Sequence, residues 1–192
     1  MKKKGRKRKL ALLMAVIMLF TVVGAPYALA AEPEEENIYA PYDNFPELYN
    51  AYMDALEQGD TELQDELLEI GRTSLLAEIE RSKQTAMQWR YDPDAMAWAE
   101  RFPEFFSYGR FEQRSDGWTL SLGPIEKFFW SDQMKSDGWQ ATYFRFYQNS
   151  HWDNTDVMEE QFYCHARLVY SWMQDEWNLE PWRTSMNWIT CN

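Results

Sequence analysis

From residue 44 to about residue 89, apolar residues recur at the spacing of helices. In the segment DNFPELYNAYMDALEQGD, the apolar residues Leu48, Tyr52 and Leu56 recur at the spacing of one helix face. Asn44 is placed to cap this helix, and Gly59 is placed to end it. The pattern therefore predicts a short amphipathic helix with one buried face.

A longer helical pattern follows directly, with Asp60 as its cap. Its apolar residues form two sets, at positions 63, 67 and 70 and at positions 68, 75, 79 and 86. The two sets point about 100° apart on a helical wheel, and the change falls near Gly71. Either the helix bends at this glycine, or two different partners cover it.

The pattern becomes mixed after residue 89. Asp92 and Pro93 are suited to the start of a short helix. Farther on, Trp118, Leu120 and Leu122 alternate with polar residues, and Asp116-Gly117 before them is a favoured two-residue turn. This combination predicts a β-hairpin.

Two segments near the C-terminus are harder to assign. The stretch KSDGWQATYFRFYQ has aromatic residues at both helical and strand spacing, and we interpret it as a helix. The stretch NTDVMEEQFYCHARLVYSWMQDEW predicts a short helix near Asp156, followed by a strand or extended segment that carries Cys164 and His165.

These elements indicate an α+β protein. We expect an acidic helical N-terminal arm over residues 31–90, followed by a small aromatic-rich α+β domain over residues 91–192 with a hairpin and one disulfide. The arm has fifteen acidic and three basic residues between positions 31 and 88, whereas all ten tryptophans lie from position 89 onward.

The first thirty residues have the features of a secretory signal peptide. Seven basic residues precede a fourteen-residue apolar run from Leu10 to Val23, and a cleavage site of small residues ends at Ala30. Fourteen residues are short for a membrane-spanning helix, which needs about 20. We therefore expect cleavage after Ala30, a secreted or extracytoplasmic protein, and no stable membrane insertion afterwards.

Removal of this segment would leave twelve basic and 31 acidic residues, a net charge of −19. Such a charge repels nucleic acid and anionic lipid, so we exclude both as principal partners. Cationic groups, cationic proteins and divalent cations stay open as partners.

Both cysteines, Cys164 and Cys191, lie in the exported part. An even number of cysteines in an exported chain favours a disulfide, which here would close a 28-residue loop. A disulfide-bonded sulfur is not a nucleophile, so we assign no catalytic role to Cys164. His165 is most simply explained as a buried structural residue.

Motifs for catalysis and cofactors are missing from the sequence. The two histidines and two cysteines do not have zinc-site spacing, and there is neither a glycine-rich phosphate loop nor a nucleophile elbow. We therefore assign no metal site, no cofactor and no catalytic residue. If the protein is an enzyme, His165 and Glu180 would be the acid-base pair.

The string WNLEPWR at 177–183 is the strongest candidate for a recognition site. Its candidate binding residues are Trp177, Asn178, Glu180, Trp182 and Arg183. The proline restricts the residue before it to an extended conformation, and the arginine is able to stack on a tryptophan or pair with the glutamate. The string is either an exposed binding turn or a plug that holds the C-terminus inside the disulfide loop.

The same residues resemble a known family. Cys164-His165, WNLEPWR, the terminal Cys191-Asn192 and the upstream GWTLSLGP at 117–124 resemble exported bacterial proteins of the domain of unknown function 2599. The resemblance covers roughly residues 117–192 and departs from the family pattern at Thr184, where a second proline is expected. It implies export and paired cysteines, and it implies no activity.

These observations lead to two hypotheses of function. The first is a non-enzymatic module that binds an envelope component or a protein ligand through the aromatic C-terminal domain. The alternative is a secreted hydrolase or toxin that acts on envelope or competitor targets.

Overall fold

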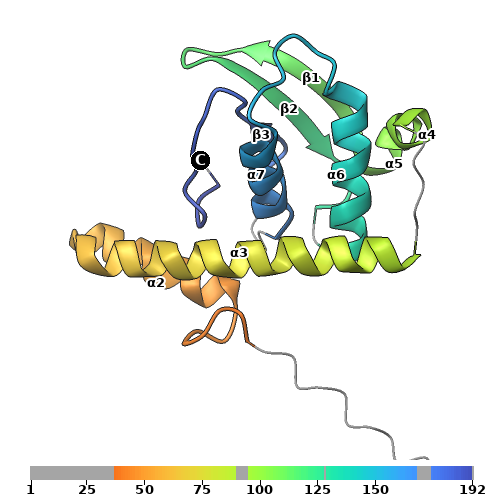
Figure 1. The fold of residues 1–192 in the computed structure, drawn as a ribbon. Coiled ribbons are helices and arrows are strands. Elements are labelled where there is room, and N and C mark those ends of the chain that lie inside the picture. Colours follow the sequence, from red (N-terminus) through yellow and green to blue (C-terminus); the bar gives the residue numbers. More distant parts are fainter. Residues whose placement is uncertain (1–36, 90–94, 128, 168–173, 192) are drawn as a thin grey trace, which may run out of the picture. The chain divides into compact units, whose positions relative to one another are not determined.

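The computed structural model describes residues 37–89, 95–127, 129–167 and 174–191, without the side chains of 85–89 and 95. The predicted signal peptide, the predicted helix start at Asp92, and the expected boundary near residue 90 lie outside the described residues. Residues 37–192 form one compact unit. Its helices and its three-stranded antiparallel sheet confirm the α+β class (Figure 1).

Helix α2 (Phe45–Gln58) begins and ends as its sequence predicts. The Asn44 side chain accepts a hydrogen bond from the Glu47 backbone N–H at 3.1 Å, and Gly59 ends the helix in the left-handed conformation with φ 69°. The predicted face is wrong at one position, because Leu56 is 50% exposed. Ala55 is buried in its place, since it continues the line of residues that faces the rest of the protein.

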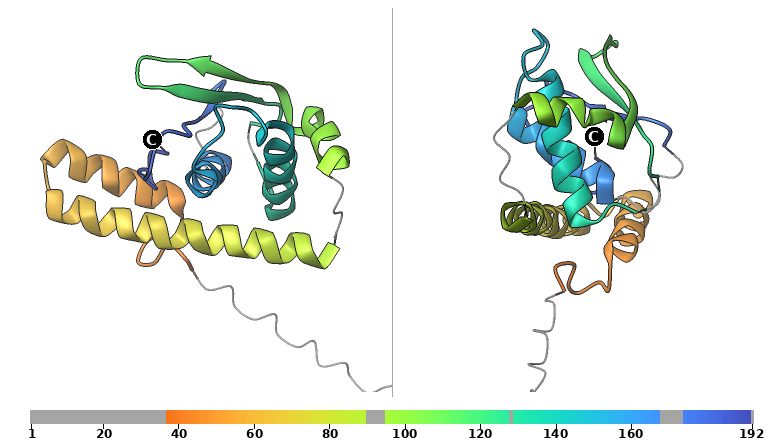
Figure 2. Two further views of the ribbon diagram at one scale, coloured as in Figure 1. Left: turned by 45° about the horizontal axis from the view of Figure 1, so that its top comes forward. Right: turned by 90° about the vertical axis from the view of Figure 1, so that its right-hand side faces the viewer.

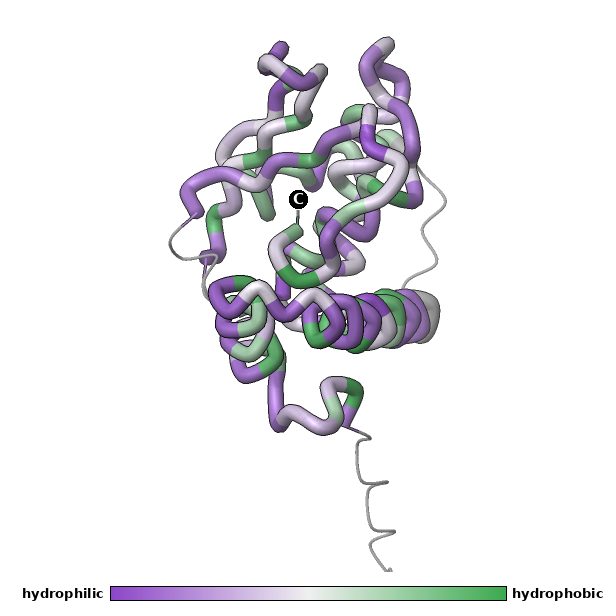
Figure 3. The backbone as a smooth tube through the Cα atoms, turned by 90° about the vertical axis from the view of Figure 1, so that its left-hand side faces the viewer, coloured by the Kyte–Doolittle hydropathy of each residue, from purple (hydrophilic) through white to green (hydrophobic). Residues whose placement is uncertain are grey.

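Helix α3 (Thr61–Trp89) continues without interruption through Gly71, and the Asp60 side chain accepts a hydrogen bond from the Leu63 backbone N–H near its start. Helices α2, α6 and α7 all pack against α3. The two apolar sets therefore reflect the packing of more than one element against α3. In Figure 3, hydrophobic and hydrophilic residues alternate around the turns of α2 and α3, as expected for amphipathic helices.

Two short helices, α4 (Ala95–Glu100) and α5 (Phe102–Phe105), lead into a sheet with the order β1-β2-β3. Strands β1 (Phe106–Gln113) and β2 (Trp118–Pro124) form the predicted hairpin, and β3 (Trp177–Leu179) pairs with β2. The Arg114 backbone N–H donates to the Gly117 carbonyl at 2.9 Å. This bond places residues 115–116 at the tip, one residue before the predicted turn.

Helices α6 (Asp132–Phe146) and α7 (Thr155–Arg167) lie between α3 and the sheet (Figure 2). The helix interpretation of the stretch in α6 is confirmed. The strand prediction for Cys164 and His165 is wrong, because both residues lie in the last turns of α7. Every residue from 161 to 167 is buried. The end of α7 therefore lacks a solvent-exposed face, and its polar residues Gln161, His165 and Arg167 are buried as well.

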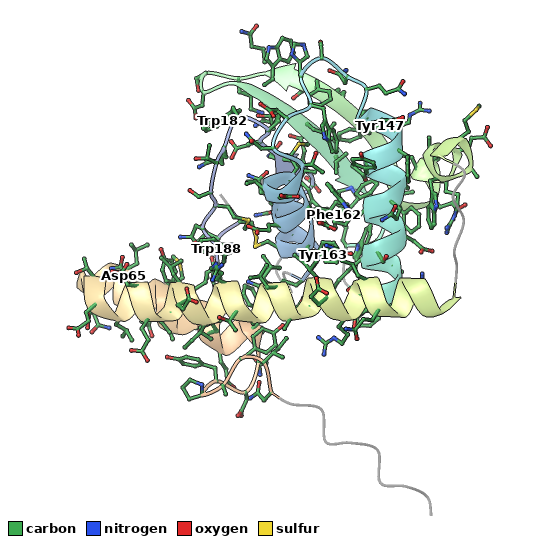
Figure 4. All side chains as sticks on the ribbon, in the orientation of Figure 1. Asp65, Tyr147, Phe162, Tyr163, Trp182 and Trp188 are labelled. Atoms are coloured by element: carbon green, nitrogen blue, oxygen red, sulfur yellow. A yellow bond between two sulfur atoms is a disulfide. The ribbon has the colours of Figure 1, made fainter. Side chains whose placement is uncertain are left out.

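Large rings from distant parts of the chain form the centre of the core. The Trp177 ring lies 5.7 Å from Phe106, 5.0 Å from Trp130 and 5.6 Å from Phe162, measured between ring centroids. Phe162 projects from α7 among these side chains (Figure 4). Tilted and edge-on ring pairs of this kind stabilise a core beyond the area that they bury.

A buried ionic cluster joins α3 to α6 and to the end of α7. The Glu78 carboxylate accepts hydrogen bonds from the Lys135 ammonium at 3.0 Å and from the Tyr39 hydroxyl, and it lies 4.0 Å from the Arg167 guanidinium. Burial, followed by the charge of Glu78, raises the pKa of Tyr39 above its usual range. The tyrosine therefore stays protonated and donates to the carboxylate.

The C-terminal segment is attached covalently and by packing. Cys164 and Cys191 form a disulfide, which confirms the pairing. Ile189 is fully buried and lies against Gly71 of α3, where an added Cβ would come within 2.8 Å of the Ile189 Cγ1 atom. In the part of the chain that the structure describes, no helix is long and apolar enough to cross a membrane.

Candidate functional site

The WNLEPWR string divides into a buried strand and an exposed turn. Trp177 and Leu179 point into the core from β3, and neither side chain is exposed. Asn178 lies on the opposite face of the sheet, because side chains alternate along a strand. The structure thus places Trp177 among the aromatic core residues, away from any ligand in solution.

Asn178 belongs to a polar network across the outer face of the sheet. Its side-chain oxygen accepts hydrogen bonds from the Arg114 guanidinium at 2.9 Å and from the Ser121 hydroxyl at 3.0 Å. Arg114 also pairs with the Glu176 carboxylate at 2.6 Å. These bonds hold Asn178 within the sheet.

His165 is 4% exposed and stacks on Trp177, with the two rings 6.0 Å apart and 11° from parallel. Its Nε2 atom lies 3.4 Å from the Asn178 carbonyl oxygen. Burial lowers the pKa of His165 to about 4. The imidazole is therefore neutral at neutral pH and a weak base, which does not suit the acid-base role considered for it.

Glu180, Trp182 and Arg183 lie together in the turn after β3. The Arg183 guanidinium pairs with the Glu180 carboxylate and lies over the Trp182 ring, 4.7 Å from its centroid. The Glu180 backbone N–H donates to the side-chain oxygen of Gln161 at 2.8 Å, and the Pro181 carbonyl accepts from the Asn154 amide at 2.6 Å. These contacts anchor the turn to the residue before α7 and to the middle of α7.

Trp182 is 39% exposed and stands beside the β1-β2 turn (Figure 4). An added Cβ at Gly117 would meet the Trp182 Cδ1 atom at 2.5 Å. Gly117 also has φ 155°, a conformation that side chains rarely adopt. A glycine at this position therefore allows the indole ring to lie directly on the hairpin.

The exposed turn borders an open hollow of about 370 Å³, which is lined by residues 117–118, 150–153 and 181–182. Its walls are mainly aromatic: Trp118 from β2, Trp152 from the α6-α7 loop, and Trp182. The His151 ring stacks on Trp118 at 3.8 Å and 15° from parallel. Asp153 supplies the one carboxylate among the residues that line the hollow.

The α6-α7 loop is held in place by its own bonds. The Asn149 side chain accepts from the His151 backbone N–H at 2.9 Å, and the Trp152 indole N–H donates to the Thr155 hydroxyl at 2.9 Å. The Trp152 ring lies 6.0 Å from the buried Trp139 ring. The wall formed by this loop is therefore preformed.

Sequence reasoning placed Trp182 at a possible site and missed the residues opposite it. The string His151-Trp152-Asp153 lies between two predicted helices, and this aromatic and charged loop was the available signal. Among the described residues, no three histidine, cysteine, aspartate or glutamate side chains are grouped so that they could hold a metal ion.

Comparison with known proteins identifies one similarity. Residues 111–191 match the family model described as "Protein of unknown function (DUF2599)", which confirms the resemblance seen in the sequence. The matched segment contains every residue that lines the hollow and both cysteines. No curated protein and no solved structure matches the chain.

Proposed function

We propose that this chain is an exported protein that binds a component of the cell envelope or a protein outside the cell, without catalysing a reaction. The aromatic hollow is the binding surface, and Trp182 is its central contact. The observation that carries this proposal is the position of Trp182, which is held on the wall of the hollow yet left 39% exposed.

The rigidity of the hollow supports a binding role. Trp182 is fixed by Gly117 on the hairpin and by the stacked Arg183, and Trp152 is fixed by its indole hydrogen bond. A preformed surface loses little conformational entropy when a ligand binds. Tryptophan and arginine are also the residues that most often dominate binding energy at interfaces.

The five residues predicted for binding take different parts in this proposal. Trp182 contacts the ligand, and Arg183 and Glu180 hold its ring and the turn. Asn178 and Trp177 support the site from the sheet and the core, and we propose no ligand contact for either. Trp118, His151 and Asp153 complete the surface.

Export is supported by the first thirty residues and by the disulfide, because such bonds persist in oxidising compartments. The alternative function, a secreted hydrolase or toxin that uses His165 and Glu180, lacks support from the geometry. His165 is buried against Trp177, the Glu180 carboxylate pairs with Arg183, and neither residue lines the hollow.

The proposal is tested by expressing the full chain in a bacterial host and purifying it from the extracytoplasmic fraction. Mass spectrometry is expected to find Ala31 as the first residue; retention in the cytoplasm with an intact N-terminus would contradict export. Co-sedimentation with isolated envelopes, and cross-linking to exported proteins, then measure binding.

Two variants isolate the hollow. Trp182→Ala is expected to weaken binding about tenfold or more while circular dichroism stays unchanged. Phe129→Ala is the matched control, because Phe129 is 70% exposed and does not line the hollow. Equal binding by both variants would refute the hollow as the binding surface. Unfolding of Trp182→Ala would instead identify Trp182 as a structural plug.

A further inference from the structure

We propose that the hollow binds an alkylammonium group, either a quaternary ammonium or the side-chain amine of a lysine-like residue. This inference rests on the proposed function and identifies the class of ligand. It is carried by two features that meet in the same place, an aromatic wall and a carboxylate that forms no ion pair among the residues that the structure describes.

The aromatic wall suits a cation. Trp118, Trp152 and Trp182 come from three separate segments and line one hollow. Tryptophan is the aromatic residue that attracts cations most strongly through its ring face, and several rings around one site form the kind of cage that recognises quaternary ammonium groups. An alkylammonium also carries apolar methyl or methylene groups, which bury favourably against indole rings.

The protein already contains an example of this attraction at the same ring. The Arg183 guanidinium carbon lies 4.7 Å from the centroid of the Trp182 ring. Arg183 does not line the hollow, and its charge is paired with Glu180. The internal cation therefore orients the indole without occupying the hollow.

Asp153 provides the charge that selects a cation. Its carboxylate accepts a hydrogen bond from the neighbouring Asn154 backbone N–H at 2.8 Å. Within the described residues, it forms no ion pair with a lysine or arginine. Two carboxylates near this side of the sheet are paired, Glu176 with Arg114 and Glu180 with Arg183, whereas Asp116 at the hairpin tip accepts a hydrogen bond from the Ser115 hydroxyl.

Apart from Asp153, His151 is the only ionisable residue among those that line the hollow. No lysine or arginine lines the hollow. From residue 10 onward the chain has twelve basic and 31 acidic residues, and this excess of negative charge draws cations toward the surface from a distance. The same charge disfavours anionic ligands. A neutral sugar would stack on the rings and donate hydroxyl hydrogen bonds to the Asp153 carboxylate, but it carries no positive charge for that carboxylate to neutralise.

The test measures binding to the purified protein in mildly alkaline buffer by nuclear magnetic resonance titration. The probes are choline, Nα-acetyllysine amide, and the uncharged isostere of choline in which carbon replaces nitrogen. We expect choline or the lysine derivative to perturb the indole signals of Trp118 and Trp182. The isostere is expected to bind about tenfold more weakly, because it has the same shape without the charge.

Asp153→Asn is expected to weaken binding of the ammonium probe about tenfold. The asparagine oxygen still accepts the Asn154 N–H, so the loop keeps its bond. Asp65→Asn is the matched control: it changes net charge equally at an exposed position of α3, away from the hollow (Figure 4), and should leave binding within about twofold.

The outcomes separate this inference from the proposed function. Equal binding of choline and its isostere, or full binding by Asp153→Asn, overturns the ammonium assignment. Failure of both ammonium probes also overturns it. In each case, loss of envelope or protein binding by Trp182→Ala would still support the hollow as a binding surface. If Trp182→Ala keeps that binding, the proposed function itself fails.

Discussion

Removal of the Cys164–Cys191 disulfide is the perturbation whose magnitude follows most directly from the structure. The bond joins residues 27 positions apart and so closes a loop of 28 residues. In the chain-entropy model, opening a loop of this size raises the entropy of the unfolded chain and costs about 3.6 kcal/mol of folding free energy at 25 °C. For a domain of this size, that loss lowers the melting temperature by roughly 7 to 14 °C.

The assay is urea unfolding of the oxidised protein, the reduced protein and the double variant Cys164→Ala/Cys191→Ala. Reduced wild type keeps both buried sulfur atoms, so its difference from the oxidised form isolates the cross-link. The double variant also loses the packing of two buried side chains, and it should be less stable than the reduced protein by about 1 to 2 kcal/mol.

A difference below about 1 kcal/mol between oxidised and reduced protein would refute this reasoning. It would mean that the C-terminal segment already stays close to α7 in the unfolded chain, or that its packing alone limits unfolding. The buried Ile189 and Met186 are the residues that would provide this packing. An Ile189→Ala variant in the reduced protein would then unfold at much lower urea concentration than reduced wild type.

Three further results are expected. Glu78→Gln should lower the unfolding free energy by about 3 to 5 kcal/mol in urea titrations, because it leaves two buried cations without their shared carboxylate; a loss under 1 kcal/mol would contradict this view of the cluster. Because the pKa of His165 is lowered to about 4, only the unfolded state takes up a proton on this side chain between pH 6.5 and pH 4. The free energy of unfolding should therefore be highest above pH 6.5 and fall by about 3 kcal/mol in total as the pH is lowered to 4. The pH profile of His165→Asn should lack this decline. Gly117→Ala should lower the free energy of unfolding by about 1 to 3 kcal/mol and displace the Trp182 ring. Tryptophan fluorescence should then shift and ligand binding should weaken, while the nuclear magnetic resonance signals of the β1-β2 hairpin persist.

Local chemistry made much of the fold predictable. The ends of α2 follow from Asn44 and Gly59, whose roles depend on the residues beside them. The hairpin follows from alternation in β2 and a turn sequence, although the turn is shifted by one residue. The disulfide was predictable because a chain with two cysteines has a single pairing available.

Burial from several sides was the feature that misled sequence reasoning. All residues from 161 to 167 at the end of α7 are buried, including the polar Gln161, His165 and Arg167. The segment therefore has no division into a buried apolar face and an exposed polar face, and its sequence suggested a strand around Cys164 and His165. Leu56 was wrong in a different way: its helix was predicted correctly, but the leucine is solvent-exposed because no other element covers it.

The amino-acid sequence by itself determined the secondary structure that depends on neighbouring residues, the covalent cross-link, the acidic charge and the resemblance to the family. Only the tertiary structure decided that Trp177 is buried while Trp182, five residues later, faces solvent. It also brought residues 117–118, 150–153 and 181–182 together around one hollow. The physical reason is that exposure depends on contacts between distant segments, whereas caps, turns and periodicity depend on residues a few positions apart.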